Sequence, residues 1–182
     1  MEVPTEPVYA GFWPRLGAML IDIFIGLPLA LLSMWAEHEY RLFDVYRLVP
    51  LIILSAIYSI YLVARFHGTP GKLVLGLRIT KLDGHPVPGR AAIIRHIPEL
   101  VLWSLVTIAL CVPLLVMSEA QYSALVANFH DRTECLRANA PAWHGPVNVI
   151  YMVWVWGELV VLQTNRKRRA LHDFLAGTVG LA

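Results

Sequence analysis

The stretch LGAMLIDIFIGLPLALLSM, residues 16–34, decides the fold class of this chain. Asp22 is its only ionisable residue, and almost all the others are apolar. A helix needs about 20 predominantly apolar residues to cross roughly 30 Å of hydrocarbon. Because lipid offers no water to the backbone, its hydrogen bonds must be made within the segment. Residues 16–34 are therefore predicted to form a membrane-spanning helix, and the run is longer than the apolar core of a cleaved signal peptide.

Three further apolar stretches of similar length lie at residues 48–64, 97–117 and 147–163. The composition agrees, with 57% hydrophobic and only 15% charged residues. Soluble domains contain about 45–50% apolar and 25% charged residues. We therefore predict an all-α membrane protein with four transmembrane helices in a single domain, residues 1–182. The lipid bilayer is its first expected partner.

The Lys and Arg residues are divided unevenly between the two sides of the membrane. Eleven of the fifteen fall at the N-terminus, between the second and third helices, and in the C-terminal tail. The other four fall in the two remaining loops. Because cytoplasmic loops carry the excess of Lys and Arg, both termini are predicted to face the cytoplasm.

Two segments outside these helices are predicted to lie at the membrane interfaces. Tyr122, Leu125, Val126 and Phe129 repeat at helical spacing, which indicates an amphipathic helix on the outer surface. The C-terminal segment, residues 166–182, is too short and polar to span the membrane. It is expected to pack under the bundle at the inner interface.

Several functional classes find no support in the sequence. A net charge of +2 gives no reason to expect nucleic-acid binding. Cys111 and Cys135 do not form a disulfide framework and are expected to be free thiols. No nucleophile and base are arranged for catalysis. We expect no catalytic residues, no enzyme activity, no metal site and no cofactor.

Asp22 is the most informative residue, because an ionisable group within a membrane helix costs about 2.5–3.5 kcal/mol on insertion scales. Such groups usually face a protein interior or a water-filled cavity. Glu158, on the fourth helix, is expected at a similar depth, about 7–9 Å below the cytoplasmic surface. Arg15 is expected to point away from Asp22, because helical side chains lean towards the N-terminus. Lys72 and the run Arg166–Arg169 are the other available cations.

Three interpretations of these charges remain open. In the first, acids and bases form a structural clamp that fixes helix packing at the inner interface. In the second, Asp22 and Glu158 handle a proton or a cation, because burial of a carboxyl group allows it to exchange protons near neutral pH. Lipid or small-ligand binding is the third alternative.

Three sequence blocks resemble the RDD family of bacterial membrane proteins, which is named for one arginine and two aspartates. The first is Gly11-Phe12-Trp13-Pro14-Arg15-Leu16, followed by Asp22. The second is Thr69-Pro70-Gly71-Lys72 with Leu75-Gly76-Leu77-Arg78-Ile79 and Asp83-Gly84. The third is Arg169-Ala170-Leu171-His172-Asp173 with Ala176-Gly177-Thr178-Val179. By this resemblance the named residues are Arg15, Asp22 and Asp173.

The resemblance implies a multi-pass protein of the bacterial inner membrane with a suspected transport role, and cation/proton antiport is reported for some members. This chain departs from the simplest pattern by Pro14 before Arg15 and by an extra helix with a long outer loop before the closing motif. A specific activity therefore does not transfer directly.

These arguments lead to a functional hypothesis and a competing one. In the first, a small transporter couples ions or substrate through Asp22 and Glu158. Arg15, Asp173, Lys72 and His172 then form a cytoplasmic charge clamp. Transport by only four helices would favour a homodimer. In the competing hypothesis the chain does not transport, and serves as an assembly or accessory subunit that binds another membrane protein or lipid.

Overall fold

The structure, a computed structural model, describes residues 9–128 and 132–181. The elements in chain order are α1 (Phe12–Glu39), α2 (Phe43–Ala56), the π-helical segment η1 (Ile57–Tyr61), α3 (Leu62–Phe66), α4 (Pro70–Val74), β1 (Arg78–Lys81), α5 (Gly89–Val116), α6 (Glu119–Asn128), α7 (Arg132–Ala138), α8 (His144–Thr164), α9 (Leu171–Ala176) and β2 (Thr178–Leu181).

Four helical stretches are long and apolar enough to cross a membrane, which confirms the predicted fold class. They are Phe12–Glu39, Phe43–Val74, Gly89–Val116 and His144–Thr164. Apolar side chains on their outer faces are largely exposed, as Phe24 at 71% and Val153 at 67% illustrate. Lipid takes the place of water at such a surface. Which side of the membrane holds the termini stays a prediction.

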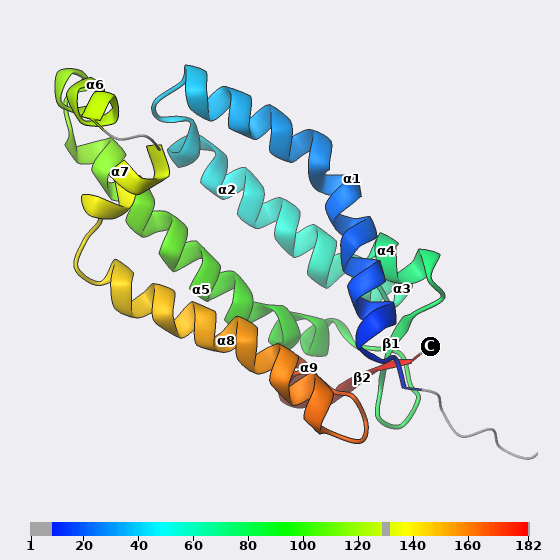
Figure 1. Ribbon diagram of the computed structural model, residues 1–182. Coiled ribbons are helices and arrows are strands. Elements are labelled where there is room, and N and C mark those ends of the chain that lie inside the picture. The colour runs from blue at the N-terminus through cyan, green and yellow to red at the C-terminus, as the bar shows by residue number, and fades with distance from the viewer. Residues whose placement is uncertain (1–8, 129–131, 182) are drawn as a thin grey trace, which may run out of the picture.

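The four long helices lie side by side in the order α1, α2, α5, α8, and successive helices run in opposite directions (Figure 1). α2 packs on α5, and α5 packs on α8. α1 is held chiefly by α4 and makes a smaller contact with α2. The packing of α1 therefore depends on the loop that follows α3.

The observed helices extend beyond the apolar runs from which they were predicted. The third one begins at Gly89, directly after Pro88, and Pro98 lies in its interior. The extra turns contain Arg95 and His96, and because these residues are polar the predicted apolar run began only after them, at residue 97. Both side chains are nevertheless buried. A helix end can be buried in protein beside the membrane, where hydropathy does not detect it.

A small antiparallel sheet closes the end of the bundle at which α1 begins and α8 ends, here called the base (Figure 1). Strand β1 pairs with β2, with Arg78 opposite Leu181. The Ala10 amide donates to the Gly180 carbonyl on the other side of β2. The sequence analysis expected only helices here. Strands of four residues, paired across about a hundred positions of sequence, leave no local periodicity to detect.

The opposite end of the bundle, here called the top, carries α6 and α7 (Figure 1). Helix α6 covers most of the predicted outer amphipathic segment, whereas Phe129 lies outside the described residues. Cys111 and Cys135 are both buried and free.

Candidate functional site

Asp22 is bound by three donors from the second helical stretch and the loop after it. Tyr58 and Thr69 each donate a hydroxyl hydrogen bond over 2.6 Å, to Oδ1 and Oδ2 of Asp22 respectively. The Gly71 amide donates to Oδ1 over 2.6 Å. Among the described residues no cation forms an ion pair with this carboxylate. Neutral hydrogen-bond donors therefore take the place of the cationic partner that the sequence led us to expect for Asp22.

Gly71 is required at this point by close packing as well as by its hydrogen bond. A Cβ added to Gly71 would overlap the carbonyl oxygen of Ala18 and lie 2.7 Å from Asp22 Oδ1. Pro70 occupies the first turn of α4, where its missing amide hydrogen costs nothing. The sequence Thr69-Pro70-Gly71 is thus a turn shaped to sit against α1 and bind Asp22.

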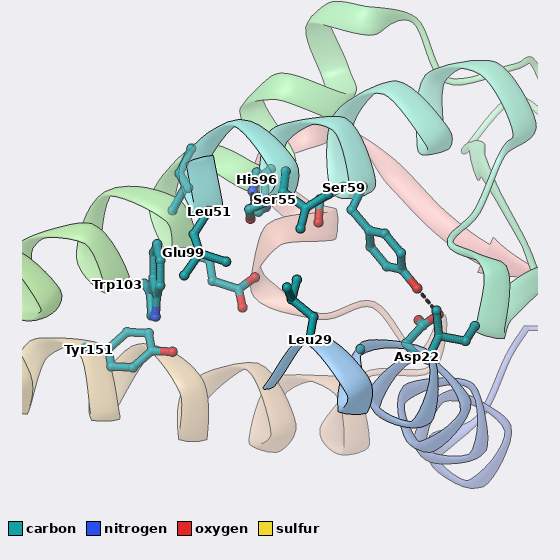
Figure 2. Close-up of a pocket in the computed structure, with 14 residues that line it drawn as sticks. Asp22, Leu29, Leu51, Ser55, Ser59, His96, Glu99, Trp103 and Tyr151 are labelled. Atoms are coloured by element: carbon teal, nitrogen blue, oxygen red, sulfur yellow. Dashed lines mark hydrogen bonds between the residues drawn. The ribbon is translucent and has the colours of Figure 1, made fainter. Parts of the chain in front are cut away.

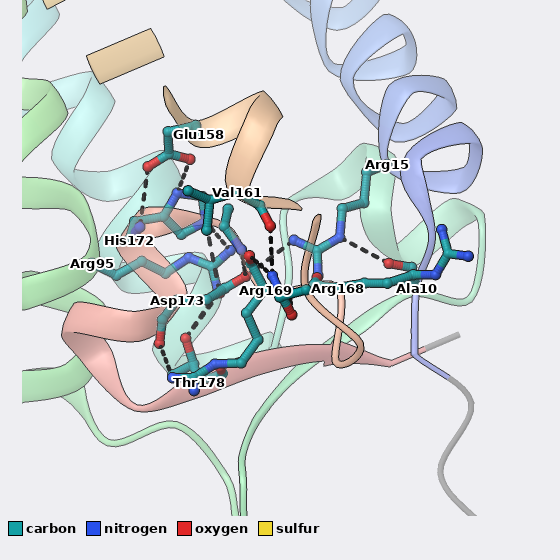
Figure 3. Close-up of polar contacts among 12 residues, drawn as sticks. Ala10, Arg15, Arg95, Glu158, Val161, Arg168, Arg169, His172, Asp173 and Thr178 are labelled. Atoms are coloured by element: carbon teal, nitrogen blue, oxygen red, sulfur yellow. Dashed lines mark hydrogen bonds and ion pairs between the residues drawn. The ribbon is translucent and has the colours of Figure 1, made fainter. Parts of the chain in front are cut away.

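Asp173 is the centre of a second polar cluster, at the base of the bundle (Figure 3). Its side chain is fully buried between two guanidinium groups, Arg15 at 3.1 Å and Arg95 at 2.9 Å. The Thr178 hydroxyl and the Ala170 amide also donate to it. This arrangement joins α1, α5 and the C-terminal segment through one carboxylate.

The pKa of Asp173 reflects two opposing effects. Burial alone raises it, but the Arg95 and Arg15 guanidinium groups and the Ala170 amide outweigh burial and hold the pKa well below its usual range. Asp173 is therefore ionised at neutral pH.

Arg15 also contacts the chain before α1 and the backbone before and after Asp173. Its guanidinium donates to the carbonyls of Ala10, over 3.2 Å, and Arg168, over 2.8 Å. It crosses β2 at Gly180, where an added Cβ would come within 2.8 Å of Nη2. One side chain thus connects the start of α1 with both ends of the C-terminal segment.

His172 links this cluster to α8. Arg95 Nη2 lies 2.7 Å from His172 Nε2, and a guanidinium can only donate. Nε2 is therefore the acceptor, and the proton of the neutral ring is on Nδ1, which faces Glu158. Burial and the nearby Arg95 lower the pKa of His172, in agreement with a neutral ring.

The structure places the residues predicted from sequence in two separate groups. Arg15, Asp173 and His172 lie together at the base, and Glu158 joins them through His172. Lys72 lines a small recess beside Arg15 and Arg95, and has no ion pair within the described ranges. Asp22 and Glu158, which the sequence analysis assigned to one coupling site, bind different partners.

A cavity of about 610 Å³ lies among the four long helices (Figure 2). Its lining combines a few polar groups with a largely apolar wall. The lining residues are Asp22, Ile25, Gly26, Leu29, Leu51, Leu54, Ser55, Tyr58, Ser59, His96, Glu99, Leu100, Trp103 and Tyr151. Figure 2 shows Asp22 at one end, Trp103 and Tyr151 at the other, and Glu99 between them.

Glu99 differs from the other carboxylates of this region because no hydrogen bond or ion pair to it is found in the described part of the chain. It follows Gly89, the start of α5, by ten residues, as Asp22 follows Phe12, the start of α1. Both carboxylates therefore lie about 15 Å along helices that begin at the base. Figure 2 shows the Glu99 carboxylate directed into the cavity.

Most polar groups near Glu99 are already engaged with one another. His96 Nε2 lies 3.0 Å from the Ser55 hydroxyl, which ties α5 to α2. The Tyr58 hydroxyl donates a hydrogen bond to Asp22. Glu99 is thus the carboxylate of the cavity with free acceptor capacity.

A third polar cluster closes the top of the bundle. Arg47 pairs with Glu37 at 2.5 Å and with Asp44 at 2.6 Å. Arg132, on α7, pairs with Asp44 at 2.7 Å and also donates to the Tyr122 hydroxyl over 2.8 Å. The cluster lines a second, smaller cavity of about 240 Å³, which shares Leu51 and Trp103 with the first.

Fold and site together define a multi-pass membrane protein with a polar base and a cavity between its helices. The RDD family model matches residues 9–177, and the chain belongs to the RDD family. The match confirms the resemblance seen in the sequence. No curated protein and no solved structure matches the chain.

Sequence reasoning missed two of the residues that organise these sites. Arg95 was noticed only as a charge beside the third helix, yet it is buried and binds both Asp173 and His172. Tyr58 lies within an apolar run, and nothing in that run marks it as the partner of Asp22. The apolar run begins only two residues before Glu99, so its place ten residues into α5 became clear only from the longer helix.

Proposed function

We propose that this RDD family protein is a small transporter that binds a cation in the cavity and exchanges it for a proton. The observation that carries the proposal is the Glu99 carboxylate, which lies on a helix long and apolar enough to span the membrane and faces the cavity with no hydrogen bond or ion pair from the described residues. Ionisable groups at membrane depth mark substrate and ion pathways. The proposed reaction is binding and release, with no enzymatic step and no cofactor.

The proposal modifies the roles inferred from sequence. Asp22 and Glu99 share the cavity, and Glu99 has the free acceptor atoms that a cation or proton needs. Asp22, held by three donors, adds negative charge to the cavity and fixes α4 to α1. Glu158 is hydrogen-bonded to His172, so it connects α8 to the base and does not face the cavity.

Membrane location is part of the same proposal. We expect the bacterial inner membrane, with the base facing the cytoplasm, because eleven of the fifteen Lys and Arg residues lie at that end. A homodimer remains the expected assembly for transport.

Proton flux in reconstituted vesicles tests the proposal. A pH-sensitive dye would report flux after pulses of sodium, potassium, lithium or the organic cation tetraethylammonium, for the natural chain, Glu99→Gln and Asp22→Asn. Glu134→Gln, an exposed substitution on α7, serves as the control. We expect cation-dependent flux that Glu99→Gln abolishes and Glu134→Gln preserves.

Two outcomes would contradict the proposal. Flux that persists in folded Glu99→Gln protein would remove Glu99 from the pathway. No flux of any cation through correctly oriented natural protein would exclude cation/proton exchange, and would favour the accessory subunit that binds another membrane protein or lipid.

A further inference from the structure

The size of the cavity distinguishes between kinds of cation. A bare inorganic ion is held by several oxygen atoms in direct contact, as the six to eight oxygens around calcium illustrate. A space of about 610 Å³ is far larger than such a cage. Cavities of roughly 300–1,000 Å³ with apolar walls and a few polar groups are typical of organic ligands.

The chemistry of the wall points to the charge of that ligand. The Asp22 carboxylate already accepts hydrogen bonds from Tyr58, Thr69 and Gly71, so Glu99 is the one carboxylate among the described lining residues that accepts none. One carboxylate with free acceptor atoms in a largely apolar wall suits a ligand with one positive charge.

Aromatic rings lie beside that carboxylate. Trp103 and Tyr151 occupy the end of the cavity next to Glu99 (Figure 2). Faces of tryptophan and tyrosine attract organic cations, and their bodies are apolar. The leucines of α1 and α2, such as Leu29 and Leu51, complete a wall that suits hydrocarbon.

The helix arrangement supplies a route from the bilayer. α1 packs on α4 and α2, whereas α8 packs on α5 and α9, so the side between α1 and α8 is not closed by helix packing. Gly26 of α1 lines the cavity, and a Cβ added there would meet no atom within 4 Å. A ligand that partitions into lipid can therefore reach the cavity sideways.

We propose that the cavity binds an amphipathic organic monocation, whose charge pairs with Glu99 and whose apolar body lies against Trp103, Tyr151 and the leucines. The inference rests on the proposed function for its transport step, because it names the cargo of the same site. Binding itself does not depend on transport.

Equilibrium binding of tetraphenylphosphonium to the protein in lipid nanodiscs tests the proposal, with empty nanodiscs subtracted. Tetraphenylborate, which has the same shape and the opposite charge, is the matched control ligand. We expect saturable binding of the cation and none of the anion. Glu99→Gln should weaken it by at least about tenfold, because the cation loses its charge partner.

A second variant keeps the proposal testable if the loss of Glu99 disturbs folding. Gly26→Leu retains every carboxylate, places a side chain in the empty space of the cavity and suits a helix. It should reduce tetraphenylphosphonium binding, whereas Glu134→Gln should leave binding unchanged.

The outcomes separate this inference from the proposed function. If tetraphenylphosphonium does not bind above the level of empty nanodiscs while sodium, potassium or lithium still drives proton flux, the organic cargo is contradicted. The proposed cation/proton exchange then stands. Binding equal in the natural chain, Glu99→Gln and Gly26→Leu overturns the site. Saturable, Glu99-dependent binding without any flux supports the ligand and removes the transport step.

Discussion

The Gly71 amide donates a hydrogen bond to Asp22 Oδ1 over 2.6 Å, so a turn between the second and third spanning helices is fixed directly to the first. The contact is so close that it excludes any side chain at Gly71. Because α1 makes only a small contact with α2, this turn holds α1 in the bundle and positions Asp22, which lines one end of the cavity.

Gly71→Ala should destabilise the protein, because the new Cβ overlaps the Ala18 carbonyl and pushes α4 away from Asp22. Overpacking of this kind costs about 1–3 kcal/mol. Thermal unfolding in detergent, followed by loss of the monodisperse elution peak, would measure it. Gly145→Ala in α8 is the control, since nothing lies within 4 Å of its Cβ, and an unchanged Tm for Gly71→Ala would contradict the packing argument.

Asp173→Asn should be more damaging than any exposed change, because it leaves the Arg15 and Arg95 guanidinium groups buried without their counter-ion. Removing one partner of a buried ion pair costs about 3–5 kcal/mol. The same unfolding assay applies, with Asp83→Asn in an exposed turn for comparison. Equal midpoints for the two variants would show that the buried cluster does not stabilise the fold.

Asp173 should also make the protein sensitive to strong acid. Its pKa is depressed in the folded state, so its contribution to stability is present above the unfolded pKa of about 4 and is lost as pH falls towards the folded pKa. The unfolding temperature of the natural chain should therefore decrease once the pH is lowered below about 4. In Asp173→Asn the fall over this range should be shallower, and an identical slope in the two proteins would rule the effect out.

His172 should produce a separate dependence at milder pH. Because the folded ring has a lowered pKa, the unfolded chain binds more protons below about pH 6.5. Stability should decrease as pH falls from there, and His172→Gln should reduce this decrease. Unfolding midpoints at pH 7.5 and 5.5 would measure it, with His85→Gln in the base loop as the comparison. A larger decrease in His172→Gln would contradict the neutral ring.

Arg132→Met should loosen the top of the bundle, because Asp44 and Tyr122 lose a charged donor. Hydrogen bonds to charged groups contribute about 1.5–3 kcal/mol. Arg137→Met, an exposed change on the same helix, is the control. Faster proteolysis between α6 and α8 in Arg132→Met alone would agree, whereas equal cleavage in both variants would show that α7 is held by other contacts.

Hydropathy was sufficient to predict the four spans, because each helix must satisfy its backbone within one continuous apolar segment. It did not predict the true length of α5. Its first turns contain Arg95 and His96, and their burial depends on α9 and α2, which the local sequence does not reveal.

The amino-acid sequence by itself determined the membrane class, the family and the order of the three motif blocks. Only the tertiary structure decided which charges meet, because Asp22, Glu99 and Asp173 are separated by long stretches of chain and their partners are set by helix packing. Asp22 accepts hydrogen bonds from neutral donors, Asp173 forms ion pairs with two arginines, and Glu99 faces an open cavity. All three side chains end in a carboxylate, and their different environments arise from contacts made only in the folded chain.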